Sequence, residues 1–148
     1  MEITTLFAFY GTVVSTAALV WNIVRDSRDR PKVRLEAMIG KLYPDHTDRD
    51  YLVLTMTNVG RRPVQVKGWY GLRKKTYDGP KGIMVVTQGL PRILNESESH
   101  HEYCIDLSLL NDELKTLYVT DSAGREWHLT KKQIRQLIKQ NQNDAKEK

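Results

Sequence analysis

The sequence predicts a mainly β protein, with an N-terminal transmembrane helix, an antiparallel β-sandwich and a C-terminal amphipathic helix. Three observations lead to this fold class. Residues 3–24 contain no charged side chain. Residues 33–129 contain about seven short stretches in which apolar and polar residues alternate between turn residues, as in a sandwich. Residues 130–142 then place apolar residues at the spacing of an amphipathic helix.

Residues 1–24 are predicted to form the transmembrane helix. As a helix, the uncharged stretch is about 33 Å long, which matches a hydrocarbon core of roughly 30 Å. Trp21 lies where interfacial aromatic residues belong. A cleaved signal peptide is one alternative, but such peptides begin with basic residues and here only Glu2 is charged before the apolar stretch. A buried helix of a soluble protein is the other alternative.

Residues 25–32 are predicted to form a basic juxtamembrane linker, because Pro31 disfavours helix at the residue before it. The residues expected at the membrane interface are Trp21, Arg25, Arg28, Arg30 and Lys32. Lys and Arg gather after the span and none precedes it, and such residues stay on the cytoplasmic side. The N-terminus is therefore expected outside and the following domain in the cytoplasm.

Gly11 and Ser15 form a small-xxx-small pair within the predicted span. This spacing lets two membrane helices approach closely, so the pair is a candidate for a helix–helix contact and for a homo-oligomer through the span, although it is not the preferred interpretation. The alternative is a single span that carries two small residues incidentally.

Residues 33–129 are predicted to form the β-sandwich. The expected strands cover residues 33–39, 51–58, 64–74, 83–87, 102–107, 117–120 and 126–129, with a polar connection at 93–98 and a short helical turn at 109–114. A shift at Gly68 is expected to turn Trp69 inward. The expected core consists of large aliphatic residues, namely Leu52, Leu54, Val64, Val66, Ile105, Leu117 and Val119.

Two turns carry residue types that suit a particular backbone geometry. The second strand ends in Asn58-x-Gly60, and the third begins after Pro63. Asp121 opens a predicted type I turn in which Gly124 supplies the left-handed residue. The first run resembles an immunoglobulin-like module common in bacterial surface and membrane proteins. The stretch 119–127 resembles the closing hairpin of small bacterial and phage membrane-anchored proteins. The resemblance implies an immunoglobulin-like sandwich over residues 33–129 and specifies no activity.

Residues 130–142 are predicted to form the C-terminal helix, followed by a polar tail at 143–148. Thr130 and Gln133 have the spacing of a capping box. One apolar stripe is expected to pack on the sandwich and consists of Ile134, Leu137 and Ile138. Alternatively, the helix lies on the membrane with its cations at the headgroups, namely Lys131, Lys132, Arg135 and Lys139.

One strand carries metal-ligand residue types on a single face, namely His100, Glu102, Cys104 and Asp106. In an extended strand, residues four apart are separated by about 13 Å, so these four side chains cannot bind one ion. This face is therefore expected to be solvated, with Tyr103, Ile105 and Leu107 inward. The sequence also contains no nucleophile elbow, phosphate loop or paired-carboxylate setting. No catalytic residue, metal site or cofactor is predicted, and the protein is not expected to be an enzyme.

Basic and aromatic residues occur together in the middle of the chain, and the net charge is +5. The residues concerned are Arg61, Arg62, Lys67, Trp69, Tyr70, Arg73, Lys74 and Lys75. Such residues bind single-stranded nucleic acid or lipid headgroups, or they form a solvated strand edge that discourages strand pairing. The solvated edge is preferred, and nucleic acid is the least favoured partner.

The expected function is that of a membrane-tethered, non-enzymatic interaction module. It would bind membrane lipid and an unidentified protein partner at the cytoplasmic membrane face. The alternative is a self-assembling membrane protein that acts through its span as an effector, gate or sensor. An enzyme or metal protein is less favoured. Cys104 is the only cysteine, so the chain forms no internal disulfide, which agrees with a reducing compartment.

Overall fold

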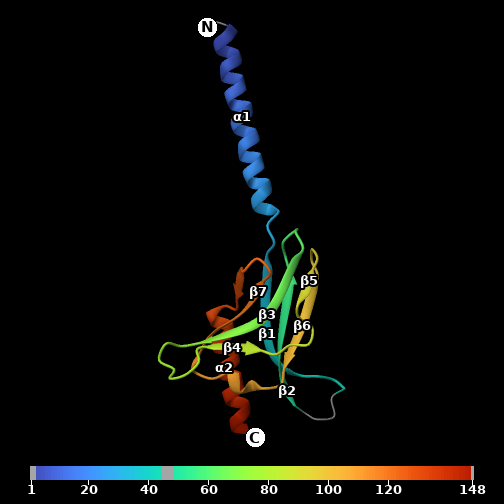
Figure 1. The fold of residues 1–148 in the computed structure, drawn as a ribbon, viewed down its shortest axis with the longest axis vertical. Coiled ribbons are helices and arrows are strands. Elements are labelled where there is room, and N and C mark those ends of the chain that lie inside the picture. Colours follow the sequence, from blue (N-terminus) through green and yellow to red (C-terminus); the bar gives the residue numbers. More distant parts are fainter. Residues whose placement is uncertain (1–2, 45–48, 148) are drawn as a thin grey trace.

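The computed structural model describes residues 3–44 and 49–147 of the chain, without the side chains of residues 4, 6, 28 and 147. One long helix projects from a domain built of two β-sheets (Figure 1). The N-terminus lies at the far end of this helix, and the chain ends at the opposite end of the molecule.

The projecting helix, α1 (Ile3–Arg28), is long and apolar enough to cross a membrane. Its stretch Phe7–Ser27 has a mean hydropathy of 1.5, and none of it is buried against the domain. The hydroxyls of Thr12 and Thr16 donate to the carbonyls four residues earlier, each at 2.8 Å, which satisfies them within the helix.

The helix continues past its predicted end at residue 24, so residues 25–28 belong to α1 and not to the linker. Ion pairs one turn apart, Arg25 with Asp29 and Asp26 with Arg30, span the end of the helix, each at 3.9 Å. Pro31 disfavours helical backbone only at Arg30, the residue before it, and α1 has already ended at Arg28.

The two sheets are antiparallel throughout. The three-stranded sheet has the order β1-β2-β6 and consists of β1 (Val33–Lys41), β2 (Asp50–Asn58) and β6 (Ser99–Cys104). The five-stranded sheet has the order β4-β3-β7-β8, with β5 also on β3, and consists of β3 (Val64–Arg73), β4 (Gly82–Val85), β5 (Arg92–Leu94), β7 (Leu114–Asp121) and β8 (Glu126–His128). A 3-10 turn, η1 (Leu107–Leu109), follows β6.

Alternating residues of the two sheets form the core, as the sequence predicted for the first three strands. Leu52, Leu54 and Met56 of β2 are fully buried, and the neighbouring residues of β2 are partly exposed. In β3 the register against β7 shifts between Val66 and Gly68, and Trp69 becomes fully buried. The predicted shift at Gly68 is therefore confirmed.

The second half of the sandwich departs from the prediction in several strand limits. Residues 92–94, expected mainly in a polar connection, form β5, and Leu94 is buried opposite Val64. The strand expected at 102–107 runs from Ser99 to Cys104, and the one expected at 83–87 ends at Val85. The helical turn expected at 109–114 lies at 107–109 instead.

The predicted inward face of β6 is wrong. Cys104 and Glu102 lie directly opposite the inward residues Leu52 and Leu54 of β2, and opposite residues of an antiparallel pair share one face. Glu102 is therefore 5% exposed, whereas Tyr103 and Ile105 are 46% and 58% exposed. Ile105 is not part of the core.

The C-terminal helix, α2 (Lys131–Glu147), packs on the sandwich. Thr130 and Gln133 form the predicted capping box, in which Oε1 of Gln133 accepts from the Thr130 backbone at 3.1 Å. Ile134 and Leu137 are each 4% exposed, and Ile138 packs against the same core. The helix runs to Glu147, so the tail predicted from residue 143 is helical in its described part.

Candidate functional site

The predicted turn residues join the domain to the segment that follows α1. Asn58 is fully buried, and its amide group donates to the carbonyls of Arg62 at 2.9 Å and Leu94 at 3.0 Å. Its Oδ1 accepts from the backbone N–H of Gly60 at 3.0 Å. Pro63 directly precedes β3. One buried side chain therefore holds the β2–β3 turn against β5.

Gly60 places this turn directly against the chain that leaves α1. The backbone N–H groups of Val59 and Gly60 donate to the Lys32 carbonyl at 2.8 and 3.2 Å. A Cβ on Gly60 would meet the Arg30 carbonyl oxygen and would lie 2.5 Å from the Lys32 nitrogen. Only glycine allows this approach. The segment after α1 is thus bonded to the domain and is not a free tether.

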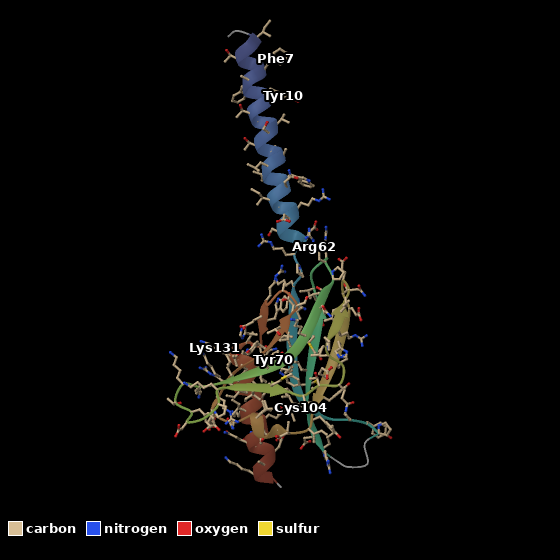
Figure 2. All side chains as sticks on the ribbon, viewed as in Figure 1. Phe7, Tyr10, Arg62, Tyr70, Cys104 and Lys131 are labelled. Carbon is tan, nitrogen blue, oxygen red and sulfur yellow. The ribbon has the colours of Figure 1, made fainter. Side chains whose placement is uncertain are left out.

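Basic residues from two separate parts of the chain meet at this junction. Trp21, Val24, Arg25 and Arg61 line a hollow of about 190 Å³. Asp29 pairs with Arg61 at 3.7 Å, and Arg62 lies beside the end of α1 (Figure 2). Of the residues predicted at the membrane interface, Trp21, Arg25, Arg30 and Lys32 are exposed, and the side chain of Arg28 lies outside the described residues. The junction is therefore a basic end of the domain, next to the apolar helix.

The other predicted residues lie on the surface of α1 and at the turn between β7 and β8. Gly11 and Ser15 are exposed on α1, and a Cβ on Gly11 would meet no atom within 4 Å. In the hairpin, Gly124 has a φ of +77°, as predicted. Oδ1 of Asp121 accepts from the backbone N–H groups of Ala123 and Arg125 at 2.9 and 2.7 Å. Asp121 and Gly124 thus have a structural role.

An open groove of about 590 Å³ lies between β4 and β6, and we call it the β4–β6 groove. It is lined by Tyr51, Ile83, Met84, Val85, Val86, Gln88, Glu102, Tyr103, Cys104, Ile105, Asp106 and Leu109. Four apolar lining residues are strongly exposed, with Met84 at 69%, Val86 at 86%, Ile105 at 58% and Tyr103 at 46%. Large apolar side chains clustered on a surface mark sites of interaction.

Both strands beside the groove are edge strands. Among the described residues, β4 pairs only with β3, and β6 pairs only with β2. An edge strand presents unpaired backbone donors and acceptors to any extended segment that approaches it. The groove therefore combines exposed apolar side chains with two strand edges.

A buried carboxylate belongs to the lining of this groove. Oε1 of Glu102 lies 2.8 Å from Nε2 of His100, and both side chains are largely buried. Gly89 packs on this pair, because a Cβ there would lie 2.5 Å from Nε2 of His100. Next along β6, burial raises the pKa of the Cys104 thiol, whose Sγ donates to the Asp106 carbonyl at 3.4 Å.

The four residues of metal-ligand type do not gather at one point. His100 and Glu102 form a pair, whereas Asp106 lies beyond the end of β6 and accepts from the Ser108 N–H at 2.9 Å. Hydrogen bonds from the side chain and the backbone of Ser108 lower the pKa of Asp106. Within residues 3–44 and 49–147, no three His, Cys, Asp or Glu side chains are placed to hold a metal ion.

The basic and aromatic residues of the middle of the chain are separated by the fold. Trp69 lies in the core and offers no surface for a base to stack on. Tyr70 stacks on Tyr118, which stacks on His128, with ring centroids 5.7 and 5.0 Å apart. This column joins β3, β7 and β8 as cross-strand pairs do. Arg73 pairs with Glu113 at 3.2 Å and lies over the Tyr77 ring at 4.2 Å.

The sequence did not identify the β4–β6 groove. Met84 and Val86 alternate in the sequence, as do Tyr103 and Ile105, so the signal for one shared face was present. Alternation does not say which face is buried, and the groove also requires two strands from different sheets to lie side by side.

A scan against protein-family models finds no match for this chain, and a search of curated proteins finds no significant match.

Proposed function

We propose that this protein is a membrane-tethered, non-enzymatic interaction module that binds a protein partner through the β4–β6 groove. The observation that carries the proposal is the exposed apolar surface of Met84, Val86, Tyr103 and Ile105 between two strand edges that pair with no other strand in the described part of the chain. The partner binds as an extended segment that adds a strand to β4 or β6.

Strand addition uses both features of the groove. Hydrogen bonds from the edge backbone supply affinity for any extended segment, and side-chain pockets select among segments. Alternate side chains of such a segment point to one face, so apolar residues at every second position reach Met84 and Tyr103. Asp106, which is exposed, supplies a carboxylate in the lining that favours a basic residue in the partner.

The tether is α1, which crosses the membrane in this proposal. Exposed basic residues at the junction, including Arg25, Arg30 and Arg61, favour anionic headgroups. Because basic residues near a span stay on the cytoplasmic side, the domain faces the cytoplasm and the N-terminus faces out. The partner is therefore bound at the cytoplasmic face of the membrane.

We also assign the sandwich to the immunoglobulin-like class. The first, second and sixth strands form one sheet, and the third, seventh and eighth belong to the other. This division agrees with the A, B and E strands facing the C, F and G strands of an immunoglobulin sandwich. An origin among small bacterial or phage membrane-anchored proteins belongs to the same proposal and rests on the sequence resemblance alone.

Site-specific photo-crosslinking in native membranes tests the groove. A photoreactive residue replaces Met84 in the groove or, as a control, Met38, which is also exposed but lies on β1 outside the groove. We expect a partner protein to crosslink at position 84 and not at position 38. Ile105→Asp should weaken the crosslink because it places a charge in the groove, whereas Ile93→Asp, at an exposed position of β5 outside the groove, should not.

Equal crosslinking at the two positions, or no partner at either, contradicts the proposal. Turnover of a substrate by the purified protein also contradicts it. A second candidate is a self-assembling span, which is favoured by the exposure of Gly11 and Ser15 on α1.

A further inference from the structure

A second groove, of about 440 Å³, lies along α2, and we call it the α2 groove. It is lined by Lys74, Asp112, Leu114, Lys115, Lys131, Ile134, Arg135, Ile138, Lys139 and Gln142. Five of these residues are cationic, and they come from α2, from β7 and from Lys74, which directly follows β3. Asp112, the one acidic residue among the described lining residues, accepts from the Gln142 amide at 3.3 Å.

None of the five cations forms an ion pair with a residue in the described part of the chain. All five side chains are exposed. Beneath them lie Leu114 and Ile134, which are buried, and Ile138, which is partly buried. The α2 groove thus has a basic rim and an apolar floor.

Three of the cations form a row along α2. Lys131, Arg135 and Lys139 are four residues apart, which places them about 6 Å apart along the helix axis. Like charges at this spacing destabilise a helix. The row therefore does not stabilise α2. An anionic ligand bound along it would reduce the repulsion between its three positive charges.

We propose that the α2 groove binds an acidic amphipathic helix of a protein partner. A helix with Asp or Glu at every fourth position has the same spacing of about 6 Å as the row on α2. Its carboxylates meet Lys131, Arg135 and Lys139, and its neighbouring apolar side chains contact Ile134 and Ile138 on the floor. The ligand matches the groove in charge, in spacing and in apolar character.

Other ligands fit these features less well. Among the described residues, the lining of the groove contains no aromatic side chain, and stacking on aromatic residues is how proteins hold single-stranded nucleic acid. A second copy of α2 would bring two basic rows together, which repel. The headgroups of the membrane crossed by α1 are distant, because α2 runs away from α1 toward the other end of the molecule (Figure 1).

This surface is separate from the β4–β6 groove. The two grooves share no lining residue, and Figure 2 labels Lys131 on the α2 side of the domain and Cys104 on the β6 side. The proposal adds a second surface to the proposed function, so a failure at one groove leaves the other proposal standing.

Fluorescence anisotropy with the full chain in non-ionic detergent tests the α2 groove. The probe is a labelled synthetic helix with Glu at every fourth position and Leu in the adjacent row. We expect saturable binding that weakens with added salt. The double variant Arg135→Gln with Lys139→Gln should bind about tenfold more weakly, because two exposed charge contacts are lost. The double variant Lys132→Gln with Lys146→Gln removes the same charge from exposed positions of α2 outside the groove, and should bind like the unaltered chain.

Lys115→Gln on β7 provides an independent variant that leaves α2 intact, and it should also weaken binding. Equal binding of a probe with Gln in place of Glu overturns the proposal, as does equal weakening by the two double variants or the absence of saturable binding. A single-stranded oligonucleotide that binds more tightly than the Glu probe, and whose binding is weakened by Arg135→Gln with Lys139→Gln, also overturns it, because the groove would then take a polyanion of another class.

Discussion

Gly60 and Asn58 determine how the domain is joined to α1. Asn58 uses its side chain to hold the β2–β3 turn, and Gly60 brings that turn onto the backbone of Arg30 and Lys32. Both residues were predicted as turn residues. Their second effect, the attachment of the segment after α1, comes from contacts between parts of the chain about thirty residues apart.

Gly60→Ala should therefore destabilise the protein. The added Cβ meets backbone atoms of Arg30 and Lys32, which cannot move aside as a flexible side chain can. We expect a loss of about 1–3 kcal/mol in the free energy of unfolding, measured by thermal or chemical unfolding of the full chain. Gly82→Ala is the matched control, because a Cβ there meets no atom within 4 Å. Equal stability of the two variants would contradict the close approach at Gly60.

Glu98 should make the stability of the β5–β6 turn depend on pH. Its carboxylate accepts from the Asn95 backbone N–H at 2.9 Å and from Arg92 at 3.3 Å, and these bonds lower the pKa of Glu98. A lowered pKa in the folded state means that ionised Glu98 stabilises the fold fully above the unfolded pKa of about 4.3. This contribution is lost as the pH falls through the lower folded pKa.

Glu98→Gln should accordingly lower the Tm near pH 7, and the difference from the unaltered chain should shrink at about pH 3. Thermal unfolding of both proteins across this range measures the effect. Glu96→Gln, at an exposed neighbouring position, is the control and should change the Tm little. A difference for Glu98→Gln that stays constant with pH would refute the role of its charge.

At the scale of elements, α2 shows how a helix with many polar residues becomes part of a β domain. Its stripe of Ile134, Leu137 and Ile138 meets the core, and the amide of Asn141 donates to the carbonyls of Leu107 and Leu110 at 3.2 and 3.1 Å. These contacts attach α2 to η1 as well as to the sheets. The helix is therefore a structural part of the sandwich.

Leu137→Ala should destabilise the protein by about 2–4 kcal/mol, because it removes buried methyl groups and leaves a cavity. Chemical unfolding of the full chain measures the change. Gln136→Ala, on the exposed face one residue earlier, should have almost no effect. If Leu137→Ala instead left stability unchanged and reduced binding to liposomes, α2 would lie on the membrane and not on the core.

At the scale of the whole molecule, a long exposed apolar helix is attached to a domain whose nearest end is basic. We expect the full chain to remain in the membrane pellet after alkaline carbonate washing. Protease added to intact cells should spare the domain and should digest it after permeabilisation, because the basic residues hold it on the cytoplasmic side. Digestion in intact cells would reverse the orientation, and release by carbonate would exclude a membrane-spanning α1.

The roles of α1 and of the domain can be separated by changing the span. Gly11→Leu with Ser15→Leu fills the small-residue face of α1, and Val13→Leu with Ala17→Leu adds bulk on the opposite face as a control. For a tethered binding module, both double variants should keep the crosslink from position 84 to the partner. If only the first variant abolishes oligomers, the crosslink and cellular activity, the protein acts through a self-assembling span.

The sequence by itself determined the features that depend on a few neighbouring residues. The uncharged stretch predicted α1, alternation predicted β1, β2 and β3, and the turn at Asp121 and the cap at Thr130 have the predicted hydrogen bonds. These features follow from local periodicity and from bonds between residues at most four positions apart. Such signals can be read without knowing what lies next to the segment.

Only the tertiary structure decided which face of β6 is buried, that residues 92–94 form a strand, and where the two grooves lie. The face of β6 follows from its register against β2, which places Glu102 opposite Leu54 and leaves Tyr103 and Ile105 exposed. The β4–β6 groove needs edge strands from two sheets, and the α2 groove needs cations from α2, from β7 and from the residue after β3. The physical reason is that burial and exposure depend on strand register and on packing between segments distant in sequence, which periodicity within one segment does not contain.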